Sequence, residues 1–126
     1  MPYEIVDIND PEVVQRVWDK GIIVENYDAT LYRKDSAGAW IARNSYGDRN
    51  SVLGWEIDHV YPEVKGGKNH FVNLRPMNWQ NNVSKGDDYP NYTAAIISDG
   101  NRNIPMGSQK TVNRALQEDL SKLYNL

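Results

Sequence analysis

Residues 54–87 read GWEIDHVYPEVKGGKNHFVNLRPMNWQNNVSKGD, and the spacing of the polar residues in this stretch decides how the chain is interpreted. Asp58 and His59 are adjacent, Asn73 follows His59 by fourteen residues, and Asn82 follows nine residues later. The packing of an apolar core alone does not require polar residues at these separations. Together they indicate a chemical site.

The residues around these positions predict a strand, a glycine-containing loop, a second strand and a short helix. β-Forming residues flank the Asp-His pair, and Pro62 ends the first strand. The second strand is expected over residues 71–74, ended by Pro76. Asn78 is then the expected N-cap of a helix that Gly86 terminates.

On this helix, Asn78, Asn82 and Lys85 are spaced i, i+4 and i+7 and therefore share a face. We expect that face to point toward Asp58 and His59. Mg²⁺ prefers oxygen ligands, needs only one or two carboxylates and keeps several waters, which Asp58 and Asn82 would satisfy. The ordinary pKa of histidine suits general-base catalysis near neutral pH. The neighbouring apolar stripe, expected to hold the helix against the strands, consists of Trp79 and Val83.

This stretch resembles the HNH motif of the ββα-metal endonucleases, in the form that begins with Asp-His and ends with Asn. The resemblance covers residues 54–87 and extends more loosely back to Arg33 through RKDSAGAWIAR and SYG. It implies an α+β fold with a ββα-metal core. The remainder of the chain would add an N-terminal helix and a C-terminal strand-helix extension.

The resemblance also implies a role for each motif residue. Asp58 and Asn82 would hold a divalent metal ion, Mg²⁺ or Mn²⁺. His59 would be the general base that activates water, and Asn73 would stiffen the loop and orient His59. The implied activity is metal-dependent hydrolysis of phosphodiester bonds in DNA. The alternative is a catalytically silent domain of this fold that binds nucleic acid or protein.

The net charge of the chain is −3, but the charge is unevenly distributed. Residues 33–85 contain eight basic and five acidic residues, whereas residues 1–32 contain two basic and seven acidic ones. The basic excess therefore coincides with the motif, as a phosphate-binding surface requires. An ordinary solvated or structural role is the alternative for each basic residue. The residues expected to contact nucleic acid are Lys85, Arg75, Lys68, Arg43 and Arg33.

Three further residues of the motif region have alternative interpretations. Asn81 competes with Asn82 as a metal ligand but lies off the predicted polar stripe. Glu56 shares a strand face with the motif aspartate and is interpreted as structural, although it could approach the metal. His70 is either an exposed loop histidine or a phosphate contact.

Before the motif, residues 3–8 are expected to form a short strand. Asp10 as N-cap and Pro11 at the first helical position predict a helix that Gly21 ends. Residues 39–42 predict a strand that pairs with the first strand of the motif.

After the motif, residues 92–97 predict a strand, and Asp99-Gly100 predicts a hairpin turn. Ser108 is the expected N-cap of a final helix. The apolar stripe within residues 112–123 is expected to pack on the core. A face that binds a protein partner is the alternative for this stripe, so a partner would dock on the C-terminal helix.

The composition of the chain is ordinary for a globular protein, with 126 residues of which 40% are hydrophobic and 25% charged. We expect a single domain over residues 1–126. No apolar run approaches the ~20 residues of a membrane span, and the N-terminus has no signal peptide pattern. With no cysteine present, these features predict a cytoplasmic protein, or an effector exported without a signal peptide, that does not bind membranes.

Overall fold

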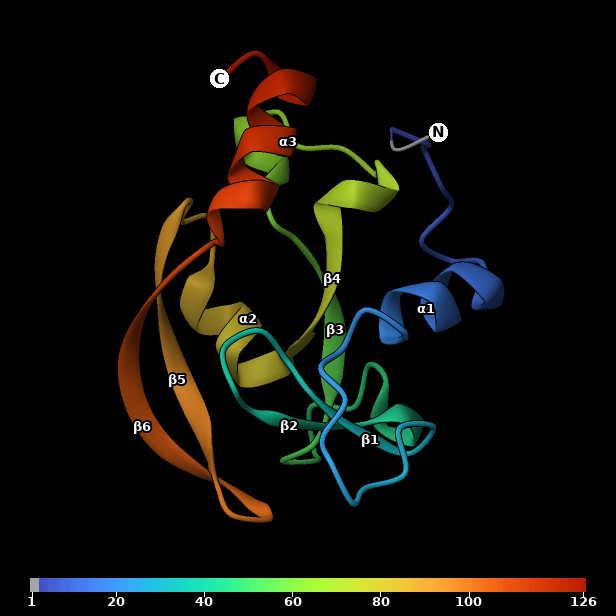
Figure 1. Cartoon of the computed structure of the whole chain (residues 1–126), viewed down its shortest axis with the longest axis vertical. Coiled ribbons are helices and arrows are strands. Elements are labelled where there is room, and N and C mark those ends of the chain that lie inside the picture. The colour runs from blue at the N-terminus through green and yellow to red at the C-terminus, as the bar shows by residue number, and fades with distance from the viewer. Residues whose placement is uncertain (1–2) are drawn as a thin grey trace.

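The computed structural model describes residues 3–126, which form a mixed α+β structure (Figure 1). The strands pair as three antiparallel two-stranded sheets, β1–β2, β3–β4 and β5–β6. In chain order the elements are α1 (Pro11–Trp18), β1 (Tyr32–Lys34), β2 (Trp40–Ala42), β3 (Trp55–His59), β4 (Leu74–Asn78), α2 (Trp79–Lys85), β5 (Asn91–Asp99), β6 (Arg102–Thr111) and α3 (Arg114–Tyr124).

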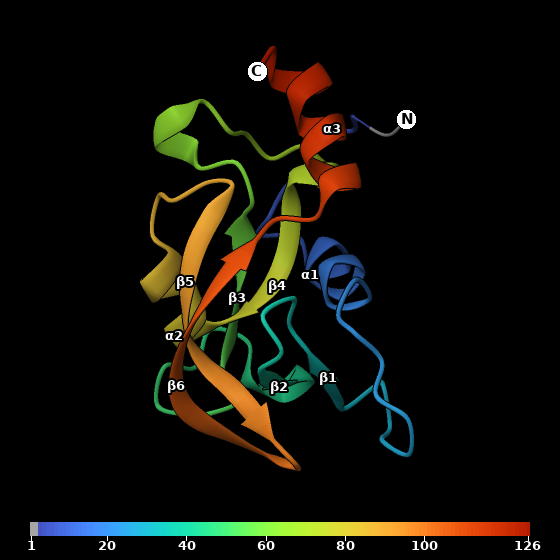
Figure 2. The same ribbon diagram turned by 60° about the vertical axis from the view of Figure 1, so that its left-hand side comes forward.

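The β3–β4 pair and α2 lie at the centre of the molecule (Figures 1 and 2). α2 follows β4 without a loop, because Asn78 is both the last residue of β4 and the N-cap of α2. The Asn78 side chain accepts a hydrogen bond from the backbone N–H of Gln80 at 3.0 Å. Gly86 follows the helix as its C-cap. The predicted order of strand, loop, strand and helix is confirmed, as are both helix ends.

The second strand of this unit starts later than predicted. Phe71–Asn73 forms a 3-10 turn, and β4 contains Pro76 in its interior. Among the described residues, β4 pairs only with β3, so its other edge is open. Proline lacks a backbone N–H and is tolerated on such an edge strand, which explains why Pro76 does not end β4.

α2 is held in place by polar contacts rather than by the predicted apolar stripe. Val83 is 56% exposed, and the buried residues of the helix are Asn81 and Lys85. The Asn81 side-chain oxygen accepts two backbone N–H groups of β5, at 2.9 and 2.8 Å. Its amide nitrogen donates to the carbonyl of Ile96 at 3.0 Å. Since all of Asn81 is engaged in this way, it is not free to serve as a metal ligand.

The N-terminus of α2 is fixed by Asp35, a fully buried carboxylate in the turn between β1 and β2. Asp35 accepts hydrogen bonds from the backbone N–H groups of Ala37, Ala39 and Asn78, at 3.1, 2.8 and 3.0 Å. The side chain of Asn81 donates a fourth, at 3.1 Å. Burial raises the pKa of Asp35, and these four hydrogen bonds to its carboxylate oppose that rise.

The first third of the chain departs from the sequence prediction in three respects. α1 ends at Trp18, with Asp19 as its C-cap, and not at Gly21. β2 pairs with β1 and not with β3, and residues 3–8 form no strand. Ile5 makes a single bridge to His70 instead. α1 begins as predicted, since the Asp10 side chain caps it by accepting the N–H of Glu12 at 2.9 Å.

The last third forms a long curved hairpin and a helix, which both views place along one side and one end of the molecule (Figures 1 and 2). The predicted strand and turn are confirmed, with Gly100 at positive φ in the β5–β6 turn. The predicted N-cap at Ser108 is wrong, because Ser108 lies within β6. The N-cap of α3 is Asn113, which accepts the N–H of Leu116 at 2.8 Å. Leu120 of α3 is fully buried, so packing of this helix on the core is confirmed.

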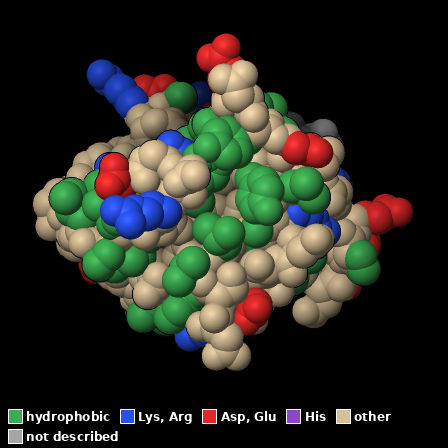
Figure 3. Space-filling view, turned by 90° about the horizontal axis from the view of Figure 1, so that it is seen from below, with side chains coloured by type: hydrophobic (Ala, Val, Ile, Leu, Met, Phe, Trp, Pro, Cys, Tyr) green, Lys and Arg blue, Asp and Glu red, His purple; other side chains and the backbone are tan. Residues whose placement is uncertain are grey.

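The end of the molecule seen from below carries a concentration of hydrophobic side chains (Figure 3). Tyr27 and Tyr32, each 41% exposed, border a small cavity together with the largely buried Trp40. Trp40 is a core residue. None of the helices within residues 3–126 has the length and hydrophobicity needed to cross a membrane.

Candidate active site

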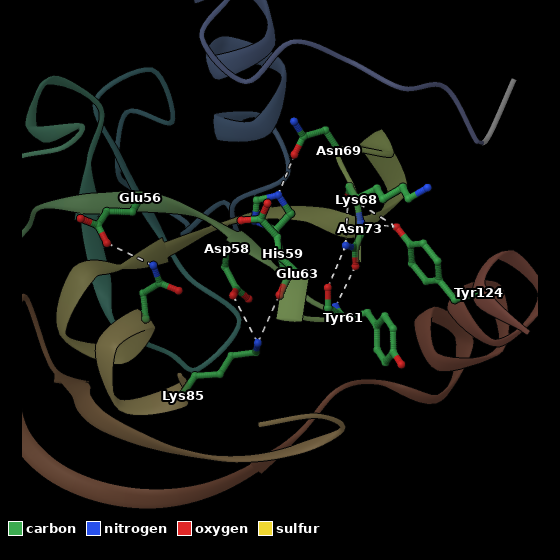
Figure 4. A network of polar contacts seen from close by, with 11 residues as sticks. Glu56, Asp58, His59, Tyr61, Glu63, Lys68, Asn69, Asn73, Lys85 and Tyr124 are labelled. Atoms are coloured by element: carbon green, nitrogen blue, oxygen red, sulfur yellow. Dashed lines mark hydrogen bonds and ion pairs between the residues drawn. The ribbon is translucent and has the colours of Figure 1, made fainter. Parts of the chain in front are cut away.

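Strand alternation places two chemically different sets of side chains on the two faces of β3. Trp55 packs with α1 in one apolar core. Glu56 and Asp58 lie on the other face, where α2 meets them (Figure 4). Asn82 Nδ2 donates to Glu56 Oε1 at 3.1 Å, and Lys85 Nζ lies 3.3 Å from Asp58 Oδ1. The polar face of α2 therefore points toward β3, as predicted.

A surface depression with a volume of about 420 Å³ opens beside the end of β3 and α2. Asp58 and His59, at the end of β3, and Asn82, on α2, all line it. The structure thus brings together three of the four motif residues. Asn73 does not line the depression. The remaining lining residues are Ile8, Ile57, Pro62, Glu63, Val64, Gly86 and Asp87.

Asp58 is only 3% exposed and contacts two cationic side chains. Arg75 Nε donates to its Oδ2 at 2.9 Å, and Lys85 Nζ lies 3.3 Å from its Oδ1. Lys85 also donates to the carbonyl of His59 at 3.2 Å. Burial lowers the pKa of Lys85, and the charge of Asp58 opposes that effect.

These contacts correct the prediction that Arg75 and Lys85 bind nucleic acid. Arg75 is 9% and Lys85 1% exposed, so neither presents its charge to a phosphate in solution. A buried carboxylate needs compensating charge and hydrogen bonds, and these two residues supply both to Asp58.

The His59 ring has a hydrogen-bond partner at Nε2, and a carboxylate lies near its Nδ1 (Figure 4). Nε2 lies 2.7 Å from the side-chain oxygen of Asn69, and Nδ1 lies 3.6 Å from Glu63 Oε1. The His59 side chain is 13% exposed and that of Glu63 70% exposed. Sequence reasoning missed Asn69, because a polar residue in a glycine-rich loop carries no periodicity that distinguishes it from its neighbours.

Asn73 is completely buried and holds the loop between β3 and β4 together (Figure 4). Its oxygen accepts the N–H of Tyr61 at 2.7 Å, and its nitrogen donates to the carbonyls of Tyr61 and Lys68 at 3.0 and 3.2 Å. It has no hydrogen bond to the His59 ring among the described residues. Asn73 therefore braces both arms of the loop, and the contact that orients the imidazole belongs to Asn69.

α3 reaches the same loop through Tyr124 (Figure 4). The Tyr124 hydroxyl accepts the backbone N–H of Lys68 at 3.1 Å and lies 2.9 Å from Nδ1 of His70. Its ring stacks on that of Tyr61, with centroids 5.2 Å apart. His70 is thus a partly buried residue of the loop, and burial lowers its pKa.

Glu56 makes structural contacts, as its favoured interpretation expected. Arg49 forms two hydrogen bonds with its carboxylate, at 2.7 and 2.9 Å. The hydrogen bond from Arg49 lowers the pKa of Glu56, and the hydrogen bond from Asn82 adds to that effect. Glu56 therefore fixes the side-chain amide of Asn82 from one side.

The other predicted nucleic-acid contacts differ in how free they are. Lys68 is exposed, whereas Arg43 donates to Gln15 Oε1 at 2.9 Å. Arg33 is enclosed by backbone carbonyls, donating to those of Ala29 and Asp19 at 2.8 and 2.9 Å. Within residues 3–126, the basic residues of the 33–85 segment that are neither buried nor bound to carboxylates or backbone carbonyls are Lys34, Arg43, Lys65 and Lys68.

The donor groups at the depression suit a hard divalent cation. Asp58 offers carboxylate oxygens with unused acceptor capacity. Within residues 3–126 the side chain of Asn82 makes one hydrogen bond, donated by Nδ2, which leaves its Oδ1 available. No three histidine, aspartate or glutamate side chains of the described chain are grouped to hold a metal ion. A metal here would depend on one carboxylate, one amide oxygen and water, which is the kind of coordination that Mg²⁺ accepts.

Comparison of the chain with protein-family models, with curated proteins and with solved structures found no match in any of the three. The contacts of Asp58, His59 and Asn82 are therefore the observations from which a function can be proposed.

Proposed function

We propose that the chain is a divalent-metal-dependent endonuclease of the HNH type, with a ββα-metal core, that hydrolyses phosphodiester bonds in DNA. The observation that carries the proposal is the meeting of Asp58, His59 and Asn82 at one depression. The order of β3, loop, β4 and α2 that produces this meeting supports it, because the order agrees with the resemblance in residues 54–87.

In this proposal Asp58 and Asn82 hold Mg²⁺ or Mn²⁺. A bound divalent ion stabilises negative charge on the phosphate and on the leaving oxygen as a Lewis acid. Arg75 and Lys85 hold the carboxylate of Asp58 in one orientation, and Glu56 does the same for the amide of Asn82. These contacts fix the orientation of both side chains before a metal ion binds, which is the preorganisation that a metal site needs.

His59 acts as the general base. It takes a proton from a water molecule as the water oxygen forms a bond to phosphorus. The bond between phosphorus and the 3′-oxygen breaks, and the leaving oxygen takes a proton from solvent. A positioned general base contributes about 10²–10⁴ to the rate of such a reaction.

Two substitutions test the ligand and base assignments separately. Asn82→Ala should weaken Mn²⁺ binding, measured by calorimetry without DNA, because it removes an oxygen ligand. His59→Ala should bind Mn²⁺ as the wild type does, yet cleave about 10²–10⁴ times more slowly. Glu118→Ala, on the exposed surface of α3, is the matched control.

A different result would contradict each of the two assignments. Wild-type Mn²⁺ affinity in Asn82→Ala would remove Asn82 from the site. A near-normal cleavage rate in His59→Ala would remove His59 from the mechanism.

One observation favours an alternative, a domain of this fold that binds nucleic acid without cleaving it. Asp58 already has two cationic partners, which a silent site would retain as its permanent charge balance. This alternative predicts DNA binding that Mg²⁺ and Mn²⁺ leave unchanged, with no strand scission. The proposed nuclease predicts scission that depends on the metal.

A further inference from the structure

Asn69 lies in the loop between β3 and β4, after Gly66 and Gly67 and before the 3-10 turn Phe71–Asn73. Hydrogen bonds on both sides fix its position in this loop. On the N-terminal side, the Lys68 backbone is bound by Tyr124 and Asn73, at 3.1 and 3.2 Å. The carbonyl of Asn69 itself accepts the N–H of Val6 at 2.9 Å. On the C-terminal side, the N–H of Phe71 donates to a carbonyl of the N-terminal segment at 2.7 Å. Backbone hydrogen bonds therefore hold the chain on both sides of the Asn69 side chain.

From this position the Asn69 side-chain oxygen faces the His59 ring (Figure 4). The distance of 2.7 Å between Oδ1 and Nε2 is that of a short hydrogen bond. An amide oxygen only accepts, so Nε2 must carry the proton. In the neutral ring the lone pair is then on Nδ1, the nitrogen on the side of the exposed carboxylate of Glu63, 3.6 Å away.

We propose that Asn69 is the positioning residue of His59, which fixes the ring orientation and the tautomer with the proton on Nε2, and so makes Nδ1 the basic nitrogen. The use of Nδ1 in catalysis rests on the proposed function. The hydrogen bond and the tautomer do not, because they belong to the protein without metal or DNA. Asn69 acts through His59 and need not touch the substrate.

The test is NMR spectroscopy of the ¹⁵N-labelled full chain without metal, at a pH of about 8.5, where an ordinary histidine is neutral. Long-range correlations from the ring protons report which nitrogen is protonated, and the directly observed ring N–H proton reports the hydrogen bond. The His59 signals are assigned by their absence in His59→Ala. Asn69→Asp keeps an acceptor of the same shape, Asn69→Leu removes it, and Asn101→Leu at the β5–β6 turn is the control.

We expect wild type, Asn69→Asp and Asn101→Leu to show a protonated Nε2 with a slowly exchanging proton. In Asn69→Leu the exchange of that proton should be about tenfold faster, since one hydrogen bond is lost. A wild-type ring protonated on Nδ1 would overturn the proposal, as would unchanged exchange in Asn69→Leu. If Asn69→Leu does not fold, the wild-type spectrum still tests the assignment, because a ring protonated on Nδ1 would overturn it. Failure of DNA cleavage with this pattern intact would refute the nuclease and leave the positioning role standing.

Discussion

Replacing Asp58 with alanine should destabilise the protein strongly, which the sequence did not indicate. The substitution leaves the cations of Lys85 and Arg75 without their partner, and these side chains are 0% and 10% exposed. Breaking a buried ion pair from one side costs about 3–5 kcal/mol, because the remaining charge stays buried. The total stability of a domain this size is about 5–15 kcal/mol, so the variant would lose a large part of it.

A double-mutant cycle isolates the contact that causes this loss. Lys85→Met removes the buried ammonium while keeping most of the side-chain volume. The double variant should therefore cost about 1–3 kcal/mol less than the sum of the two single variants. Asp99→Ala is the matched control, because Asp99 is ion-paired with Arg102 on the surface, where such pairs contribute less than about 1 kcal/mol.

The assay is urea unfolding at neutral pH and again near pH 10. Burial lowers the pKa of Lys85, and without Asp58 to oppose it that pKa falls further. Between the folded pKa and the ordinary value of 10.5, the unfolded chain then binds more protons than the folded protein. The stability of Asp58→Ala should therefore rise with pH in this window. If Asp58→Ala lost less than about 1 kcal/mol of stability at neutral pH, the reasoning would be refuted. Additive losses in Asp58→Ala and Lys85→Met would also refute it, because they would show that the two buried charges do not interact.

Three further perturbations test other parts of the structure. Asp35→Ala removes the acceptor of four buried hydrogen bonds and should lower the free energy of unfolding by about 3–5 kcal/mol in urea. The control Asp48→Ala, at an exposed site, should cost less than about 1 kcal/mol. Equal losses in the two variants would contradict the anchoring of α2 by Asp35. Tyr124→Phe should cost about 1 kcal/mol and speed amide exchange in the loop that follows β3; unchanged exchange would show that α3 does not hold the loop. Lys34, Arg43, Lys65 and Lys68 are the basic residues of the 33–85 segment available to contact phosphates. For His59→Ala and a labelled DNA duplex, the logarithm of the binding constant against the logarithm of the salt concentration should have a slope of about −3 to −4. A slope near −8 would mean that more basic residues contact the duplex than these four.

The order of elements around the motif was predictable because its signals are local. The side chain of Asn78 and the backbone freedom of Gly86 act within one turn of helix, so their positions report the ends of α2 directly. The same is true of Asp10 at the start of α1. The helical and strand periods predicted which faces of α2 and β3 are polar, and these faces do meet.

What could not be predicted depends on partners far away in sequence. β2 has an apolar pattern that fits either neighbour, and only the tertiary structure pairs it with β1. The sequence offered Asn81 as a rival metal ligand and Lys85 as a nucleic-acid contact, but contacts with β5 and Asp58 bury them. The role of Asn69 depends on a ring ten residues away, for which the sequence has no periodic signal.

The measurement that tests the nuclease proposal most directly is strand scission of supercoiled plasmid by the purified chain. With Mg²⁺ or Mn²⁺ the wild type should convert supercoiled DNA to nicked or linear forms, and a chelator should stop the conversion. His59→Ala, purified in the same way, should be slower by about 10²–10⁴. Plasmid that stays supercoiled at high protein concentration with either metal, or equal scission by His59→Ala, would contradict the proposed nuclease.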